Sequence, residues 1–467
     1  MAPVVAQDDA QLLYEGSGGV IDVQNENRIL VEGIEGTVHT RVGKPGEVRF
    51  ECRSLTNRRE ERAVSLWVEG RRFVIRPPEG SVAERLLLEI AIPPLLDVEV
   101  HLANSRLQAN GLRRSLSVRG RESTVDAHGI GGAVDVKLVG GALTVDGAQQ
   151  DVTVETEQVE VKLSNIGGFL TASFTGGSAR LNTLADGADL TVDQTQLITD
   201  TVEGHVVIRA TGGAVGLYRT SQGAELEMSE SPLTLSETKG AIVIETDDAA
   251  VEFRNHTGAI RLDGYGGSLR GSGVTGPLEV NVSEMEITLE KLGGVSTIQG
   301  DGLKVHAQEV KGSLTIQTGA STIVVQGIEA ELVVQNDFGD VFVSGAVKDV
   351  TIETRDGNVR VSEQAGPLEL KANGPEVVVG WSGMSPEKNS VVQNEGGSVS
   401  LSFFAKARCR VQAESKFGRV QSELADVRVS EDEQHASGIL GRGSRPMIQA
   451  VATGDVLIGY AEGTPQR

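Results

Sequence analysis

The sequence predicts an all-β protein, a single-stranded parallel β-solenoid of about sixteen 18-residue coils with β-rich caps at both ends. Three observations lead to this prediction. An 18-residue repeat runs from residue 97 to residue 384, apolar residues alternate with polar ones inside each repeat, and the chain has 58 glycines but only 3% aromatic residues. Such a composition is typical of tight turns between short strands of small and β-branched residues.

Four apolar columns define the repeat. When residues 97–384 are divided into sixteen units without a gap, positions 4 and 11 are apolar in all sixteen, position 2 in fifteen and position 13 in fourteen. The exceptions are Ser296 at position 2, and Thr199 and Gly271 at position 13. Position 3, between two of these columns, is apolar in only three units. Each unit is therefore expected to hold two short strands whose apolar side chains face inward.

Stacking of the units follows from the same pattern. A unit with two strands cannot bury its inward residues alone, but identical units paired in parallel and in register can. Glycine occupies position 18 in nine units, and Gly-Gly pairs such as Gly140-Gly141 recur near position 9. We expect corners there, because corners need a positive φ or a close backbone approach. At about 4.8 Å per coil, sixteen coils predict a rod roughly 75 to 80 Å long.

The two ends of the chain lack the 18-residue spacing, although they contain strand-like runs such as RILVEGIEG from Arg28 and GDVLIGYAEG from Gly454. Because solenoid ends expose unpaired strand edges, these segments are expected to form caps or looser coils. The predicted domains are an N-terminal cap at 1–96, the solenoid at 97–384 and a C-terminal cap at 385–467. Cys52 and Cys409 fall on the apolar side of alternating runs, one in each cap, which predicts core residues rather than a disulfide.

The charge of the chain limits its partners. With 43 basic and 65 acidic residues, the formal net charge is −22, which disfavours nucleic acid and anionic membranes and leaves a protein partner or self-association open. No apolar run approaches the roughly 18 residues of a membrane-spanning helix, and the start, MAPVVAQDDAQ, lacks the features of a signal peptide. We expect no transmembrane segment and a cytoplasmic location, or an extracytoplasmic or cell-surface location if a signal has been removed.

Two stretches of sequence resemble a known family. The run LLLEIAIPPLLDVEVHLANSRLQANGL from Leu86, with its Ile-Pro dipeptide before short V-x-V strands, and the ending GILGRGSRPMIQAVATGDVLIGYAEG resemble a bacterial adhesin family. The β-strand repeats of that family form a domain with no established function. The resemblance covers roughly residues 20–462 and implies a β-solenoid. It implies no catalytic residue.

An acidic column is the one candidate site in the repeat. Glu227, Glu245 and Asp263 occupy position 5 of three successive units, so stacking places their carboxylates about 4.8 Å apart. Adjacent carboxylates raise one another's pKa unless a cation or a basic group neutralises them. The column is either a weak cation site or docking stripe for a basic partner, or a solvated face flanked by Arg209 and Arg261. We favour the solvated face.

Other reactive or ligand-binding patterns are not supported. The histidines of the repeat occupy five different positions, so stacking does not assemble a zinc site: His101, His128, His205, His256 and His306. Valine and leucine follow the Gly-Gly turns where a calcium-binding roll needs glycine and aspartate. The sequence contains neither a phosphate-binding loop nor a nucleophile elbow. We predict no catalytic residue, no cofactor and no metal site beyond the weak acidic column.

The inward columns are uniform and the outward columns vary, which favours a non-enzymatic, rod-like scaffold. Adhesion is the form of this function that the family resemblance implies. One alternative is a bactofilin-like cytoskeletal scaffold that polymerises end to end. Another is a carbohydrate-binding or carbohydrate-processing β-helix, although Tyr218 and Tyr265 lie three coils apart and Trp381 lies near the end of the repeat, so no aromatic platform for sugar is expected.

Overall fold

A computed structural model describes residues 10–56, 61–80, 85–382, 388–441 and 446–461. The chain is all-β, with 69% of its residues in strands and no helix among the described residues. It forms a parallel β-solenoid of about 17 turns at a spacing of about 18 residues, so the predicted fold class is confirmed. The chain divides into two compact units, Met1–Leu233 and Thr234–Arg467.

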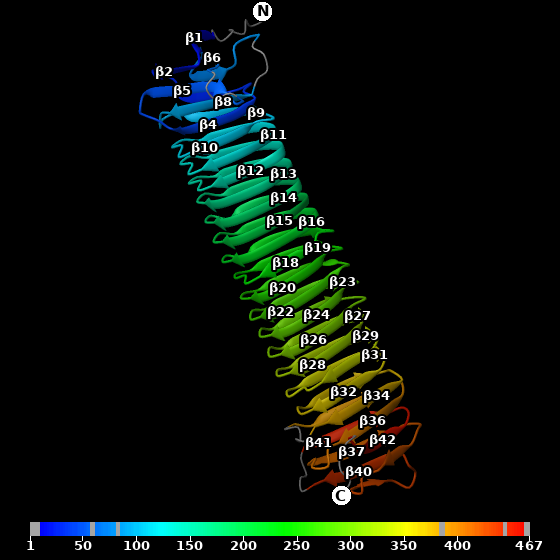
Figure 1. The fold of residues 1–467 in the computed structure, drawn as a ribbon. Coiled ribbons are helices and arrows are strands. Elements are labelled where there is room, and N and C mark those ends of the chain that lie inside the picture. The colour runs from blue at the N-terminus through cyan, green and yellow to red at the C-terminus, as the bar shows by residue number, and fades with distance from the viewer. Residues whose placement is uncertain (1–9, 57–60, 81–84, 383–387, 442–445, 462–467) are drawn as a thin grey trace, which may run out of the picture. The chain divides into compact units, whose positions relative to one another are not determined.

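The first unit runs from the N-terminal cap into regular coils, in which neighbouring strands lie side by side (Figure 1). Residues of equal repeat position are paired across an offset of 18, as in Leu116 with Val134 and Val134 with Val152. The strands are β1 (Gln11–Gly16), β2 (Gly18–Asp22), β3 (Arg28–Val31), β4 (Gly36–Val42), β5 (Glu47–Ser54), β6 (Val64–Glu69), β7 (Arg72–Arg76), β8 (Leu86–Ile92), β9 (Asp97–Ala103), β10 (Arg106–Asn110), β11 (Leu116–His128), β12 (Val134–Asp146), β13 (Val152–Ile166), β14 (Leu170–Leu184), β15 (Ala188–Val202), β16 (Val206–Thr220) and β17 (Ala224–Ser229).

The strands β11 to β16 differ from the two short strands expected in each coil. Each is a single strand of 13 to 15 residues that continues through the first corner. The corner at position 8 is made by one residue with positive φ, such as Glu122, or by a Gly-Gly pair in which both residues have positive φ, such as Gly140-Gly141, and the ladder resumes at position 9, where Ser123 pairs with Gly141. One or two residues with positive φ therefore bend the strand without ending it.

The second unit has two separate strands per coil, as expected. After the corner its ladder resumes one residue later, at position 10, where Ala250 pairs with Ser268. Its strands are β18 (Leu233–Ser236), β19 (Ile242–Asp247), β20 (Ala250–His256), β21 (Ile260–Tyr265), β22 (Ser268–Val274), β23 (Leu278–Ser283), β24 (Glu286–Leu292), β25 (Ser296–Gly300), β26 (Lys304–Val310), β27 (Leu314–Ala320), β28 (Thr322–Ile328), β29 (Leu332–Phe338), β30 (Val341–Ser344), β31 (Val350–Asp356), β32 (Val359–Gln364), β33 (Leu368–Ala372), β34 (Glu376–Trp381), β35 (Ser390–Asn394), β36 (Ser398–Phe403), β37 (Cys409–Ser415), β38 (Val420–Ser422), β39 (Val427–Val429), β40 (His435–Leu440), β41 (Met447–Ala452) and β42 (Val456–Tyr460).

The four predicted apolar columns form part of the core of each unit. The three non-apolar residues in these columns, Ser296, Thr199 and Gly271, also lie in the core without leaving a gap. Ser296 and Thr199 are buried, and Thr199 Oγ1 donates a hydrogen bond to the Gly216 carbonyl at 3.0 Å. At Gly271 the ring of Phe253 from the preceding coil fills the space that a side chain would need, since an added Cβ would lie 2.0 Å from the ring. A large residue in one coil thus compensates for a missing side chain in the next.

Three further inward columns escaped the sequence analysis, at positions 6, 9 and 16. Position 6 holds Phe174 and Thr246, and position 16 holds Ile130 and His256, all of them buried. These columns mix apolar residues with threonine, serine, glycine and histidine. Positions 6 and 9 are apolar in only eight and four of the sixteen units, whereas position 16 is apolar in eleven and falls short of the four columns that define the repeat.

The corners use glycine for two different reasons. Positions 8, 9 and 15 carry positive φ angles, at glycine or at a polar residue such as Asn255. At position 18 the reason is mostly close packing of one coil on the next: a Cβ on Gly294 would lie 2.1 Å from the Gly276 carbonyl oxygen. Both reasons agree with the prediction of glycine corners, but the recurrent positive-φ positions are 8, 9 and 15 rather than 18.

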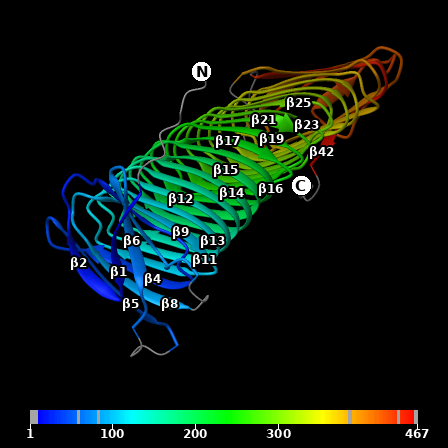
Figure 2. The same cartoon turned by 90° about the horizontal axis from the view of Figure 1, so that it is seen from above.

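The N-terminal cap contains strands that stack out of chain order. β3 pairs in parallel with β7 on one side and with β9 on the other, and β4 pairs in the same way with β8 and β10. Antiparallel strands then complete the end: β6 lies on β7, β5 lies on β8, and β1 and β2 are outermost (Figure 2). The parallel stack of the first unit is thus terminated by antiparallel pairing.

The C-terminal cap of the second unit uses a similar arrangement. The last strands of the chain, β41 and β42, lie between β35 and β36 on one side and β37 and β38 on the other. β40 then pairs antiparallel with β37, and β39 pairs antiparallel with β40. The outermost strands, β38 and β39, are only three residues long. Such short edges offer little backbone for pairing with another chain.

Cys52 in β5 and Cys409 in β37 are both buried free thiols, which confirms that they are core residues. Burial raises the pKa of each thiol to about 11. Both side chains therefore remain protonated at neutral pH, where a thiol is a poor nucleophile.

Candidate functional site

Arginines contact two of the three carboxylates of the acidic column, those of Glu227 and Asp263. In the first unit Arg209 Nε lies 3.6 Å from Glu227 Oε2. In the second unit Glu245 and Asp263 are paired neighbours in β19 and β21, and Arg261 Nε lies 2.7 Å from Asp263 Oδ2. Each unit thus supplies a basic partner for its own part of the column, as expected if these residues form a solvated face flanked by Arg209 and Arg261.

Asp263 shows the electrostatic consequence of this pairing. The hydrogen bond from Arg261 lowers its pKa, and a second hydrogen bond from Asn281 Nδ2, at 2.9 Å, acts in the same direction. Asp263 is therefore the case in which a basic group neutralises the carboxylate, and its pKa is not raised by the neighbouring acid. The arginine cancels the repulsion because it donates directly to the carboxylate.

No cluster of three or more histidine, cysteine, aspartate or glutamate residues that could hold a metal ion occurs in the described part of the chain. His256, in β20, is buried in the core with Nδ1 2.9 Å from Thr238 Oγ1. Its Nε2 has no hydrogen-bond partner among the described residues. Burial lowers the pKa of His256 against a smaller opposing effect of the surrounding backbone. The folded second unit therefore favours the neutral imidazole.

His256 leads to a prediction about pH. Below about pH 6.5 the unfolded chain takes up a proton that folded His256 resists, so this residue makes the second unit less stable as the pH falls. His256→Val is expected to lie within about 1 kcal/mol of wild type at pH 7.5, and to gain relative to wild type at pH 5. Urea unfolding at both pH values measures this difference. His306→Gln, at an exposed position, should keep the wild-type dependence, and an unchanged dependence in His256→Val would contradict the prediction.

The aromatic residues do not form a sugar platform around the tryptophans. Trp381 is buried and stacks on Phe403 with ring centroids 5.1 Å apart, where the regular coils give way to the C-terminal cap. Trp67 is half-buried beneath the Arg76 guanidinium, 4.8 Å from the ring centroid. Both tryptophans therefore belong to the packing of the caps.

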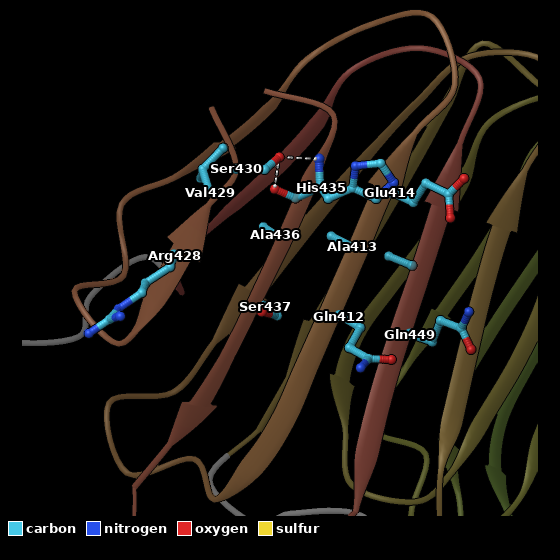
Figure 3. A pocket seen from close by; sticks show the side chains of 11 residues that line it. Gln412, Ala413, Glu414, Arg428, Val429, Ser430, His435, Ala436, Ser437 and Gln449 are labelled. Carbon is cyan, nitrogen blue, oxygen red and sulfur yellow. Dashed lines mark hydrogen bonds between the residues drawn. The ribbon is translucent and has the colours of Figure 1, made fainter. Parts of the chain in front are cut away.

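A polar hollow of 420 Å³ lies on the outer face of the C-terminal cap, over β37, β39, β40 and β41 (Figure 3). Its floor carries a cross-strand row in which Gln449 pairs with Gln412, Gln412 with Ser437, and Ser437 with Arg428. Glutamine, serine and arginine side chains offer hydrogen bonds but no nucleophile that a base activates. The sequence analysis missed this hollow because it depends on the out-of-order strands of the cap.

Ser430 and His435, which line this hollow, and the adjacent Asp432 have the composition of a catalytic triad but a different geometry. Ser430 Oγ lies 2.5 Å from Asp432 Oδ1 and accepts the His435 backbone N–H at 3.0 Å. The His435 ring contacts Asp432 instead, with Nδ1 3.8 Å from Oδ2. A triad needs the imidazole between the hydroxyl and the carboxylate, so this arrangement closes the β39–β40 turn rather than activating Ser430.

A second hollow, of 220 Å³, lies on the outward face of β28, β30 and β32 in the second unit. Phe342, which is 36% exposed, stands between Val324 and Arg360 at repeat position 12. Beside this column, at position 14, lie Gln326, Ser344 and Ser362. The outward face therefore combines an aromatic ring, a guanidinium and small polar side chains. The signal in the sequence was an aromatic residue at a position that is otherwise polar in most coils.

Comparisons with protein-family models, with curated proteins and with solved structures find no match to this chain. The described residues contain no helix with the length and apolar character that a membrane crossing requires.

Proposed function

We propose that this protein is a non-enzymatic scaffold that acts through the outward faces of its solenoid coils. The observation that carries the proposal is the contrast between the four inward columns at positions 2, 4, 11 and 13, which stay apolar in nearly every coil, and the outward columns, which change. A repeat of this kind preserves a surface of regular spacing while the side chains on it vary. Adhesion is the form of this function that the family resemblance implies.

The ends of the stack support lateral rather than end-to-end interaction. In the C-terminal cap the outer strands β38 and β39 have three residues each, and in the N-terminal cap antiparallel strands cover the last parallel coil. End-to-end growth of a solenoid needs parallel edges of matching length at both ends. We therefore place the interaction on the faces, with end-to-end polymerisation as the competing hypothesis.

Sedimentation velocity and electron microscopy of the full chain test this proposal. We expect one sedimenting species over a hundredfold range of concentration, and no filaments. Incubation with neutral and acidic polysaccharides is expected to release no reducing sugar. Filaments that lengthen with concentration would favour the polymerising scaffold, and sugar release would overturn the non-enzymatic assignment.

A further inference from the structure

We propose that the hollow on β28, β30 and β32 binds a sugar-acid residue of an anionic polysaccharide. This inference rests on the proposed function, because it names a ligand for one outward face of the scaffold. The hollow measures 220 Å³, which is below the 300–1,000 Å³ that is usual for drug-sized ligands. It therefore fits a single ring-sized group of a longer chain rather than a cofactor.

Arg360 gives the hollow a local positive charge. Arg360 is the only charged residue among those that line the hollow, although the chain carries a net charge of −22. Among the described residues Arg360 forms no ion pair, whereas Arg209, Arg261 and Arg355 each contact a carboxylate. The nearby carboxylate of Asp340 accepts hydrogen bonds from the backbone and side chain of Asn358. The hollow is thus a local cationic site with a guanidinium that can receive a carboxylate in bidentate fashion.

The polar side chains that line the hollow are available to hydrogen-bond a ligand. In the described structure the side chains of Gln326, Ser344 and Ser362 make no hydrogen bond to protein. Elsewhere on the outward surface, neighbouring amides bond to each other along the stack, as Gln317 does with Gln335 at 3.0 Å. The lining groups of the hollow therefore keep their donors and acceptors for a ligand that carries hydroxyl groups.

The exposed ring of Phe342 offers an apolar surface beside Arg360. Phe342 is 36% exposed and stands next to Arg360 on the neighbouring strand. An exposed ring face can cover the apolar face of a sugar ring, while Arg360 holds its carboxylate and Ser344 and Ser362 contact its hydroxyls. The hollow thus provides one kind of contact for each part of a sugar acid.

A polysaccharide suits this face better than a peptide. Extended peptides bind sheets mainly through main-chain hydrogen bonds to a free edge. The strand β30 has no free edge, because it pairs in parallel with β28 on one side and with β32 on the other. Recognition here must use side chains alone. Side chains at one repeat position recur about every 4.8 Å along the stack, so they can contact successive groups of an extended polymer.

The test is isothermal titration of the full chain with oligogalacturonate, a polymer of sugar acids, alongside uncharged dextran and poly-glutamate. Wild type is expected to bind oligogalacturonate more weakly as salt increases, and to bind neither of the other two polymers. Arg360→Gln and Phe342→Ala should each weaken binding at least tenfold. The matched control Arg355→Gln removes an arginine that pairs with Asp337 outside this hollow, and should bind as wild type does.

The outcomes separate this inference from the proposed function. Melting temperatures equal to wild type show that a loss of binding is not a loss of fold. If wild type fails to bind oligogalacturonate, or if Arg360→Gln and Phe342→Ala both bind it as wild type does, the proposed sugar-acid site is wrong. The scaffold proposal would still be supported by one sedimenting species that releases no sugar. Equal binding of poly-glutamate, lost in Arg360→Gln, would show a general anion site and overturn the assignment to sugar. Sugar release by wild type would refute the proposed function and leave the binding site intact.

Discussion

Ile244→Asp lowers the free energy of unfolding by about 4 kcal/mol, whereas the adjacent change Glu245→Lys alters it by no more than about 0.5 kcal/mol. Ile244 is fully buried in β19 and Glu245 is exposed on the other face of the same strand. An aspartate at 244 has no basic partner among the inward columns and loses its hydration, which is the costly case for a buried charge. For a unit of this size the loss corresponds to a fall in melting temperature of about 12 °C.

The paired variant is the control for this prediction. Both substitutions change charge at neighbouring residues of one strand, so they differ mainly in the side of the sheet that they affect. In Glu245→Lys the ion pair between Arg261 and Asp263 is retained, which keeps the surface charge balanced. Thermal unfolding followed by circular dichroism measures both. Melting temperatures that agree within the error of measurement would refute the assignment of inward and outward faces.

The regular coils could be predicted from sequence because their order along the chain is also their order in space. Under that condition a column of one repeat position is a row of contacts, and apolar positions such as Ile244 reveal the core directly. Positions 6 and 16 were missed, since Thr246 and His256 replace apolar residues there in some coils. Burial of these polar residues depends on their neighbours in the stack and not on their own hydrophobicity.

The caps could not be predicted in the same way. β3 lies beside β9, which begins 69 residues later in the chain, and the final strands β41 and β42 lie between earlier ones. Such pairings follow from which edges remain unpaired after the regular coils have formed, and no local pattern in the sequence records them. The hollow over β37 to β41 was missed for this reason.

In the candidate sites too, sequence predicted the features that follow from regular stacking but not those that depend on the placement of individual side chains. The acidic neighbours Glu245 and Asp263 were predicted correctly as a stacked pair because both lie in regular coils. Arg261 was expected to flank this pair, but the direction of the pKa shift at Asp263 stayed open, because it depends on whether Arg261 donates directly to that carboxylate. The hollow beside Phe342 required a further fact, namely that the polar side chains next to it have no partners within the protein.

Gly294→Ala is the second substitution with a large expected effect, a loss of about 3 kcal/mol in the free energy of unfolding, or about 9 °C in melting temperature. Gly294 lies at position 18, where the backbone of one coil closely approaches that of the next. An added Cβ would lie 2.1 Å from the Gly276 carbonyl oxygen, so the backbone of one coil must move away from the next. In the next coil, a Cβ added at Gly312 would likewise lie 1.9 Å from the Gly294 carbonyl oxygen. The displacement therefore disturbs a column of glycines and not a single turn.

The preceding residue provides a matched control. At Gly293 an added Cβ would lie 3.4 Å from its nearest neighbour, the Val274 carbonyl oxygen, and the backbone has no positive φ. Gly293→Ala should therefore be neutral, or stabilising by about 0.5 kcal/mol, because alanine restricts the unfolded chain. Chemical denaturation of the two variants separates steric contact from glycine content, since each variant removes one glycine from the same corner. If both lose the same stability, the close approach of coils at position 18 is not what requires glycine there, and the flexibility of the corner must be the reason instead.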